Sequence, residues 1–170
     1  MTAPTISLTW DFICRLTTCA EALDWGRQTY DGRVNIPAST LIRRLMRENK
    51  LDWANWLIVR VMTPPQYLRY AIYAAEQVLN LYERQYHGDV RPRQAIEAAR
   101  RCLHDDSQSA GAAWAAGAAG AAGAAWAAWA AAMAAGAAWA AEAAAMAAEA
   151  AMKRKILTYG LRVLSEKESR

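Results

Sequence analysis

Residues 110–152 form a stretch of alanine that is interrupted by other residues at steps of three or four positions. Alanine is the strongest helix former, so this stretch predicts helix. At about 100° per residue, the bulky interruptions gather on one broad face of that helix, and the glycines at 117, 120 and 123 gather on the other with the glutamates at 142 and 149. The bulky face holds Trp114, Trp126, Trp129, Met133, Trp139 and Met146. The stretch therefore predicts an all-α fold, a compact multi-helix bundle around a central Ala-rich helix or helical hairpin.

A single straight helix over this stretch would be too long for one domain. It would extend for roughly 65 Å at about 1.5 Å per residue, whereas a domain of this size has a radius of gyration of about 15 Å. We expect a break or bend within 117–123, where each of the glycines costs up to about 1 kcal/mol relative to alanine. The Ala-rich core element is predicted over 109–164, and residues 165–170 are expected to fray.

Two other interpretations of the Ala-rich stretch compete with a buried helix. No charged residue occurs between Ser107 and Ala141, a span long enough to cross a bilayer. However, alanine and glycine drive insertion weakly, and the tryptophans lie in the middle of the span, not in belts at its two ends. Disorder has a polar and charged signature that alanine and tryptophan do not match. We therefore expect a buried helical element and no membrane partner.

The overall composition is typical of one cytoplasmic domain. A chain of 170 residues is long enough to bury a sizeable core, and we expect a single helical domain over 1–170. The net charge of +4 is unevenly spread along the chain, and the basic run at 153–155 is too short for a nucleic-acid patch. The three cysteines include no CxxC pair, which favours a reducing compartment. The first ten residues lack the features of a signal peptide.

The rest of the chain also has helical spacing of apolar residues, and no period-two alternation predicts a strand. Helices are expected over 9–30, from Pro37 to about Lys50, and over 53–62, 65–86 and 92–103. The segment from Thr63 to Gln66, with two prolines, is typical of a capping box at a helix start.

A dense group of charges surrounds the junction between the last two of these helices. Four arginines and one glutamate of this group are candidates for partner binding, because guanidinium groups suit carboxylates and phosphates. These candidates are Arg91, Arg93, Glu97, Arg100 and Arg101. Glu76 and Glu83 lie seven residues apart, hence on one helix face. In an antiparallel hairpin that face would meet Arg93 or Arg100, so we interpret the two glutamates as structural charges. Arg91 and Glu97 are then the side chains more exposed to partners.

No residue pattern predicts catalysis, a cofactor or a metal. His87 and His104 form no metal-binding motif with the cysteines, since Cys102-x-His104 lacks a second pair of ligands. Cys102, His104 and Asp105 are near neighbours at a helix end, whereas the members of a nucleophilic triad usually converge from separate elements. The glycine-rich run at 117–123 lacks the Lys-Ser/Thr of a phosphate-binding loop. We therefore predict a protein without enzymatic activity.

Residues 71–103 read AIYAAEQVLNLYERQYHGDVRPRQAIEAARRCL and precede the Ala-rich stretch. This block resembles the Imm-5-like family of immunity proteins, whose members share an RPr-AIeaar motif before an alanine-rich repeat. Residues 19–25 and 51–61 are similar to segments of phage-borne members, so that the resemblance covers about residues 10–160. It implies a protein that binds and neutralises a toxin by masking its active site, with a protein target as partner.

Two other functions are kept as alternatives. The same scaffold would suit a phage or prophage counter-defence inhibitor, such as an anti-CRISPR, directed at a bacterial defence component. A small-ligand or nucleotide binder would use a pocket between helices, because such pockets are mostly apolar and aromatic. The candidate residues for that pocket are Trp114, Trp126, Trp129 and Trp139. A second copy of this chain, in a homo-oligomer, is a further candidate for the partner.

Overall fold

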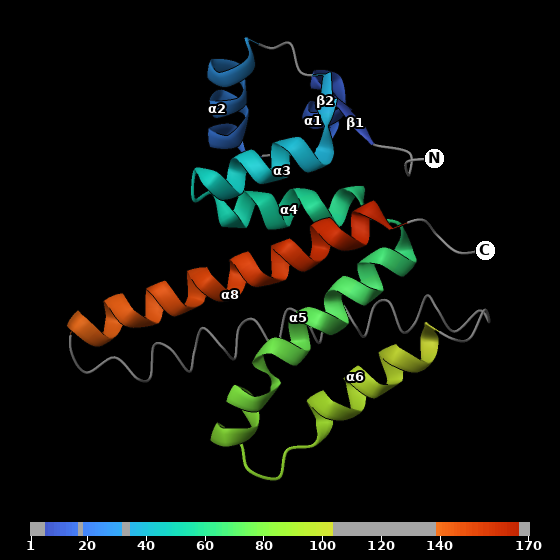
Figure 1. The fold of residues 1–170 in the computed structure, drawn as a ribbon, viewed down its shortest axis with the longest axis vertical. Helices are drawn as coiled ribbons and strands as arrows, with labels where there is room; N and C mark the ends of the chain where they lie inside the picture. The colour runs from blue at the N-terminus through green and yellow to red at the C-terminus, as the bar shows by residue number, and fades with distance from the viewer. Residues whose placement is uncertain (1–5, 17–18, 32–34, 104–138, 167–170) are drawn as a thin grey trace. The chain divides into compact units, whose positions relative to one another are not determined.

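The computed structural model describes residues 6–16, 19–31, 35–103 and 139–166 of the chain. Of these residues, 80% lie in seven helices, and the remainder include one two-stranded sheet. The predicted all-α class is therefore confirmed (Figure 1). The first part of the Ala-rich element, with the glycine break expected within 117–123, lies outside the described residues. None of the described helices combines the length and the hydrophobicity that crossing a bilayer requires.

The chain divides into two compact units. The first comprises residues 1–61 with 164–170, and the second comprises residues 62–163. The prediction of one domain over 1–170 is not tested by this division alone and stays a prediction. The first unit contains β1 (Ser7–Thr9), α1 (Trp10–Arg15), α2 (Ala20–Tyr30), β2 (Asn35–Pro37), α3 (Ala38–Arg47) and α4 (Leu51–Val61). The second contains α5 (Pro64–Gln85), α6 (Arg91–Cys102) and most of α8 (Trp139–Ser165).

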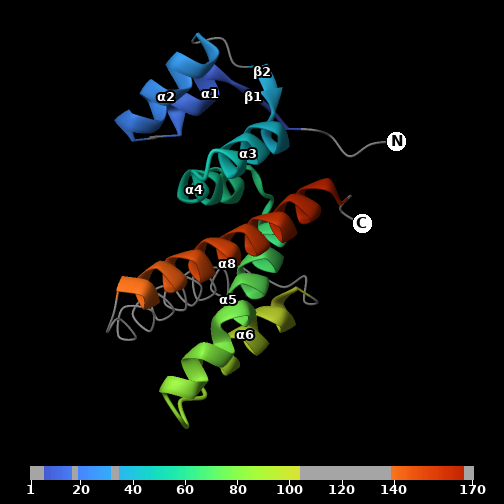
Figure 2. The ribbon, with the colours of Figure 1, turned by 60° about the vertical axis from the view of Figure 1, so that its left-hand side comes forward.

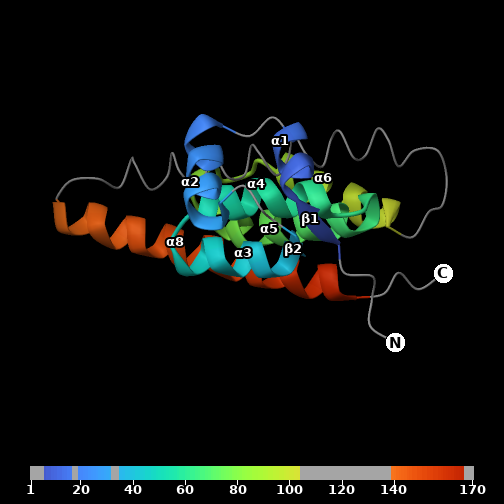
Figure 3. The same ribbon diagram turned by 90° about the horizontal axis from the view of Figure 1, so that it is seen from above.

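The start of the chain differs from the single helix expected over 9–30. Strand β1 pairs antiparallel with β2, and Leu8 lies opposite Ile36. Each strand has three residues, which is too short for a period-two pattern to be recognised in the sequence. In the structure β1 does alternate, because Leu8 is fully buried and its two neighbours are exposed. Helices α1 and α2 are separate rods (Figures 1 and 3). The intervening sequence contains two β-branched threonines, whose restricted side chains lower helix propensity.

Helices α3 and α4 form the core of the first unit. They lie side by side, and their buried faces consist of aliphatic residues (Figure 2). Asn49 occupies the left-handed region at φ 58° between them. The Lys50 N–H donates to the Leu45 carbonyl at 2.8 Å and the Asn49 N–H to the Met46 carbonyl at 3.3 Å, the arrangement of a Schellman motif. This turn places Lys50 at the start of α4.

In the second unit, α5 packs against α6 and against the C-terminal half of α8. The α5–α6 core is formed by Leu68, Ile72, Ala75, Ile96 and Ala99. The rings of Tyr73 and Tyr159 stack with centroids 3.9 Å apart, which joins α5 to α8. The helices predicted over 53–62, 65–86 and 92–103 are confirmed as α4, α5 and α6, each starting one or two residues earlier.

Candidate functional site

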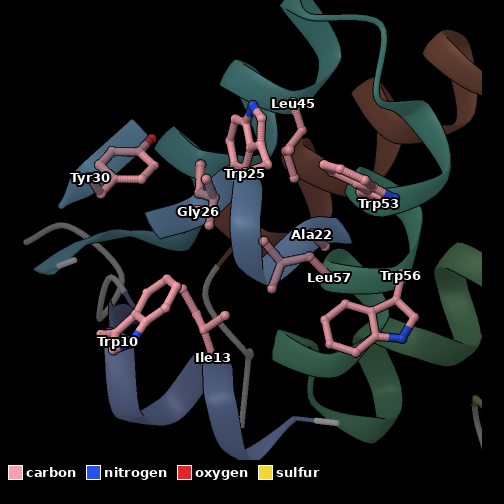
Figure 4. A pocket seen from close by; sticks show the side chains of 11 residues that line it. Trp10, Ile13, Ala22, Trp25, Gly26, Tyr30, Leu45, Trp53, Trp56 and Leu57 are labelled. Atoms are coloured by element: carbon pink, nitrogen blue, oxygen red, sulfur yellow. The ribbon is translucent and has the colours of Figure 1, made fainter. Parts of the chain in front are cut away.

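A pocket in the first unit collects most of the aromatic residues of that unit. Its volume is about 50 Å³, and the wall is almost entirely apolar. Figure 4 shows the indoles and Tyr30 arranged around it, and the four tryptophans are half-buried. The lining residues are Trp10, Ile13, Ala22, Trp25, Gly26, Tyr30, Leu41, Leu45, Trp53, Trp56 and Leu57.

Gly26 makes the close approach between α1 and α2 possible. A Cβ atom at this position would lie 2.9 Å from Cζ3 and 3.2 Å from Cη2 of Trp10. The first distance is shorter than a carbon–carbon contact, for which about 3.5–4.0 Å is optimal. The absence of a side chain at Gly26 thus lets the Trp10 ring form one wall of the pocket.

Replacing Gly26 with alanine is expected to displace the Trp10 indole, because the helix cannot move as easily as a half-buried ring. The helix-propensity gain of up to about 1 kcal/mol offsets part of an overpacking cost of about 1–3 kcal/mol. The displacement should appear as a shift in tryptophan emission when Gly26→Ala is made in the unaltered chain, and no shift should appear when it is made in a Trp10→Phe background. An unchanged spectrum of Gly26→Ala in the unaltered chain would contradict this contact.

A hydrogen-bonded group fixes one side of the pocket. The Trp25 Nε1–H donates to Oε2 of Glu48 at 2.9 Å, and Nε of Arg44 donates to the other carboxylate oxygen at 2.9 Å. The hydrogen bond from Arg44 is the main cause that lowers the pKa of Glu48, and the Trp25 indole adds to it. The same carboxylate, followed by Tyr30, raises the pKa of Arg44. The ion pair is therefore charged at neutral pH, and it holds the Trp25 ring in place.

Three cations lie against the rings of the pocket. The Lys50 ammonium is 4.1 Å from the Trp53 ring centroid and 5.9 Å from that of Trp25. The Arg44 guanidinium is 5.0 Å from the Tyr30 centroid, and that of Arg60 lies 3.9 Å from the Trp56 centroid. Contacts of this kind are worth about 0.5–1 kcal/mol at exposed sites. The three side chains therefore place positive charge around the apolar pocket.

The size and chemistry of the pocket restrict what it can hold. Pockets for small-molecule ligands and cofactors usually measure about 300–1,000 Å³, so a cavity of about 50 Å³ is too small for a nucleotide. It has room for a few waters or for the end of one aliphatic side chain. Among the residues described, no group of three or more potential metal ligands occurs.

The tryptophans predicted to line a pocket are not the ones that form this site. Trp114, Trp126 and Trp129 lie outside the described residues. Trp139 begins α8, but its side chain is not among those described. The prediction for these four residues therefore stays untested. A signal for the observed site was present in the sequence, because Trp53 and Trp56 are three residues apart and share a helix face.

The charge group of the second unit forms interhelical ion pairs. Arg93 makes two hydrogen bonds to Glu83, from Nε at 2.9 Å and from Nη2 at 2.8 Å. Nη2 of Arg100 donates to Oε1 of Glu76. The two pairs join α5 to α6, as the spacing of the glutamates predicted for the case of an antiparallel hairpin. The exposed side chains of Glu97 and Arg101 make no ion pair with any described residue, and whether they bind a partner stays a prediction.

The ion pairs lead to a double-mutant prediction with an internal control. Glu76→Ala and Arg100→Ala should be non-additive by about 0.2–1 kcal/mol, the range measured for exposed pairs. Glu76→Ala and Arg93→Ala should be additive, because the two residues belong to different pairs. Urea unfolding of the single and double variants measures both quantities. Equal additivity in the two cycles would contradict the pairing of Glu76 with Arg100.

Arg91, the remaining arginine of this charge group, has a local role that its sequence spacing did not predict. Arg91 donates from Nε at 2.9 Å and from Nη2 at 2.7 Å to Asp89, although its side chain is 85% exposed. Asp89 also accepts from the Arg91 backbone N–H at 3.1 Å and from the Tyr82 hydroxyl at 2.7 Å. Asp89 thus connects the end of α5 to the start of α6.

These hydrogen bonds give the hairpin a pH dependence. The Arg91 side chain, then the Tyr82 hydroxyl, lower the pKa of Asp89 well below its usual range. Because the pKa is lower in the folded state, the stabilisation is complete above the unfolded value of about 3.9 and is lost as the pH falls through the folded value. We expect Asp89→Asn to flatten the loss of stability below about pH 4, measured by thermal melting. If Asp89→Asn and the unaltered protein lose stability in parallel as the pH falls, this role of Asp89 is contradicted. Asp24→Asn is the matched control.

Comparison with known proteins finds no relative: no protein family, no curated protein and no solved structure matches this chain. The resemblance to Imm-5-like proteins at residues 71–103 therefore stays a prediction. The site is accordingly interpreted from its own geometry.

Proposed function

We propose that this chain is a non-enzymatic inhibitor that binds a protein target, and that it belongs to the immunity class which neutralises a toxin. The observation that carries the proposal is the pocket of Trp10, Trp25, Trp53 and Trp56, with Arg44 beside it. Tryptophan, tyrosine and arginine are the residues most enriched among binding hot spots in protein interfaces. The resemblance of residues 71–103 to immunity proteins supports the same class.

The surroundings of the pocket suit an interface that is formed before binding. The Trp25 ring is held by Glu48 and by edge contacts with Trp53 and Tyr30, at centroid distances of 5.9 and 6.2 Å. Side chains that are already ordered lose little conformational entropy when a partner binds. A half-buried aromatic cluster of this kind supports a protein-binding function more than the nucleotide-binding alternative, for which the cavity is too small.

Growth rescue in a bacterial host tests the proposal. The chain is co-expressed with any toxin that is encoded beside its gene, and we expect it to restore growth. Trp53→Ala should abolish the rescue, whereas Leu81→Ala, which removes a side chain 45% exposed in the other unit, should preserve it. Melting curves of both variants exclude misfolding as the cause. A toxin that is not neutralised by the unaltered chain would contradict the immunity function. Capture of a bacterial defence protein would favour counter-defence instead.

A further inference from the structure

The charge around the aromatic pocket indicates the chemistry of its partner. Residues 38–61, which form α3, α4 and their turn, contain five Lys or Arg residues and two Asp or Glu residues. Positive charge around a site attracts acidic partners and repels basic ones, both during encounter and in the complex. The two helices that supply the pocket floor thus carry a net positive charge.

The cations nearest the pocket differ in how far they are already neutralised. Arg44 shares the Glu48 carboxylate with Trp25, so the charge of that ion pair is balanced locally. Lys50 and Arg60 make no ion pair with any residue that the structure describes. Arg60 also donates from Nη1 to the Trp56 carbonyl at 2.9 Å. Lys50 is a half-buried residue, and its ammonium above Trp53 is the group most available to a carboxylate at the edge of the pocket.

The same cations argue against a positively charged ligand. Aromatic cages bind quaternary ammonium groups through ring faces that the ligand covers. Here Lys50, Arg44 and Arg60 already lie over the rings, so an incoming cation would be placed among three positive charges. The volume of about 50 Å³ also limits the occupant to the end of one side chain.

We infer that the pocket receives the end of one leucine or methionine side chain from an acidic segment of a partner protein, and that a neighbouring carboxylate of this segment pairs with Lys50. The inference rests on the proposed function, which supplies the protein partner, and it names the chemistry that the partner presents. The apolar side chain provides burial, and the carboxylate provides orientation and selectivity.

Selection from a random peptide library against the immobilised full chain tests this inference. We expect the enriched peptides to carry a leucine, isoleucine or methionine next to an aspartate or glutamate. A synthetic copy of the best peptide should bind about tenfold more weakly to Lys50→Glu, and also more weakly when its apolar residue is replaced by alanine. Binding should weaken with added salt, because the Debye length falls to about 3 Å at 1 M.

Arg43→Glu is the matched control, since it makes the same charge change at an exposed position of α3 outside the pocket lining. Lys50→Gln, which keeps a side chain of similar length, guards against misfolding and should weaken binding less than Lys50→Glu. Basic or uncharged selected peptides, an equal effect of Arg43→Glu and Lys50→Glu, or no enrichment would each overturn the inference. A Lys50-dependent self-association of the chain in light scattering would also overturn it, in favour of a second copy as occupant.

The failure of this inference is distinguishable from the failure of the proposed function. If Trp53→Ala abolishes rescue from the toxin and Lys50→Glu does not affect it, the proposed function is retained and the inference of an acidic partner segment is rejected. Selected acidic peptides without any toxin neutralisation would preserve the pocket chemistry and remove the immunity function.

Discussion

Trp25→Ala is expected to lower the free energy of unfolding of the first unit by about 3 kcal/mol, within the range of large-to-small aromatic substitutions. The substitution removes the edge contacts with Trp53 and Tyr30, the hydrogen bond to Glu48 and a ring face that Arg44 and Lys50 share. Aromatic pairs alone contribute about 0.5–1.5 kcal/mol each beyond the area they bury. Urea unfolding followed by circular dichroism measures the loss.

Two companion variants separate the causes of this loss. Trp25→Phe keeps an aromatic ring and removes the N–H donor, so it should recover most of the stability while Glu48 keeps only its ion pair with Arg44. Leu81→Ala deletes a side chain that is 45% exposed and should stay within about 0.5 kcal/mol of the unaltered protein. If Trp25→Ala unfolds at the same urea concentration as Leu81→Ala, the aromatic cluster does not stabilise its unit.

Gln66→Ala is expected to cost about 2–3 kcal/mol, because it removes a buried amide and leaves each of its two hydrogen-bond partners without that bond. Gln66 is 6% exposed. Its Oε1 accepts from the Thr63 N–H at 3.1 Å, and its Nε2 donates to the Val163 carbonyl at 3.2 Å. The variant therefore leaves the start of α5 and a carbonyl of α8 without their hydrogen bonds. The change in the midpoint of thermal or urea unfolding measures the cost.

Gln77→Ala provides the control for the second prediction. The Gln77 side chain donates to the Tyr73 carbonyl within α5 itself and is only partly buried, so its removal should cost less than about 0.5 kcal/mol. Gln66→Glu adds a second test, since the carboxylate retains an acceptor for Thr63 but cannot donate to Val163 when ionised. Equal effects of the alanine variants at Gln66 and Gln77 would show that the link to α8 contributes nothing.

Local sequence signals predicted much of the helical architecture. The prolines and Gln66 after Thr63 marked the start of α5, and Asn49 with Lys50 marked the end of α3, because caps and turns depend on neighbouring residues. The spacing of Glu76 and Glu83 predicted their meeting with arginines of α6, since a short turn leaves two helices antiparallel. The sheet was missed because its strands are three residues long and its pairing joins distant residues.

The candidate site depended on contacts between elements that no local pattern specifies. Helical spacing places Trp53 and Trp56 on one face of α4, but it does not indicate that Trp25 of α2 and Trp10 of α1 converge on that face. The capping role of Gln66 could likewise be predicted, whereas its bond to Val163 joins residues 97 positions apart. Propensity, capping and periodicity are properties of adjacent residues and define helices. Which side chains then share a pocket is decided by tertiary packing, because burial brings together residues whose separation along the chain carries no signal.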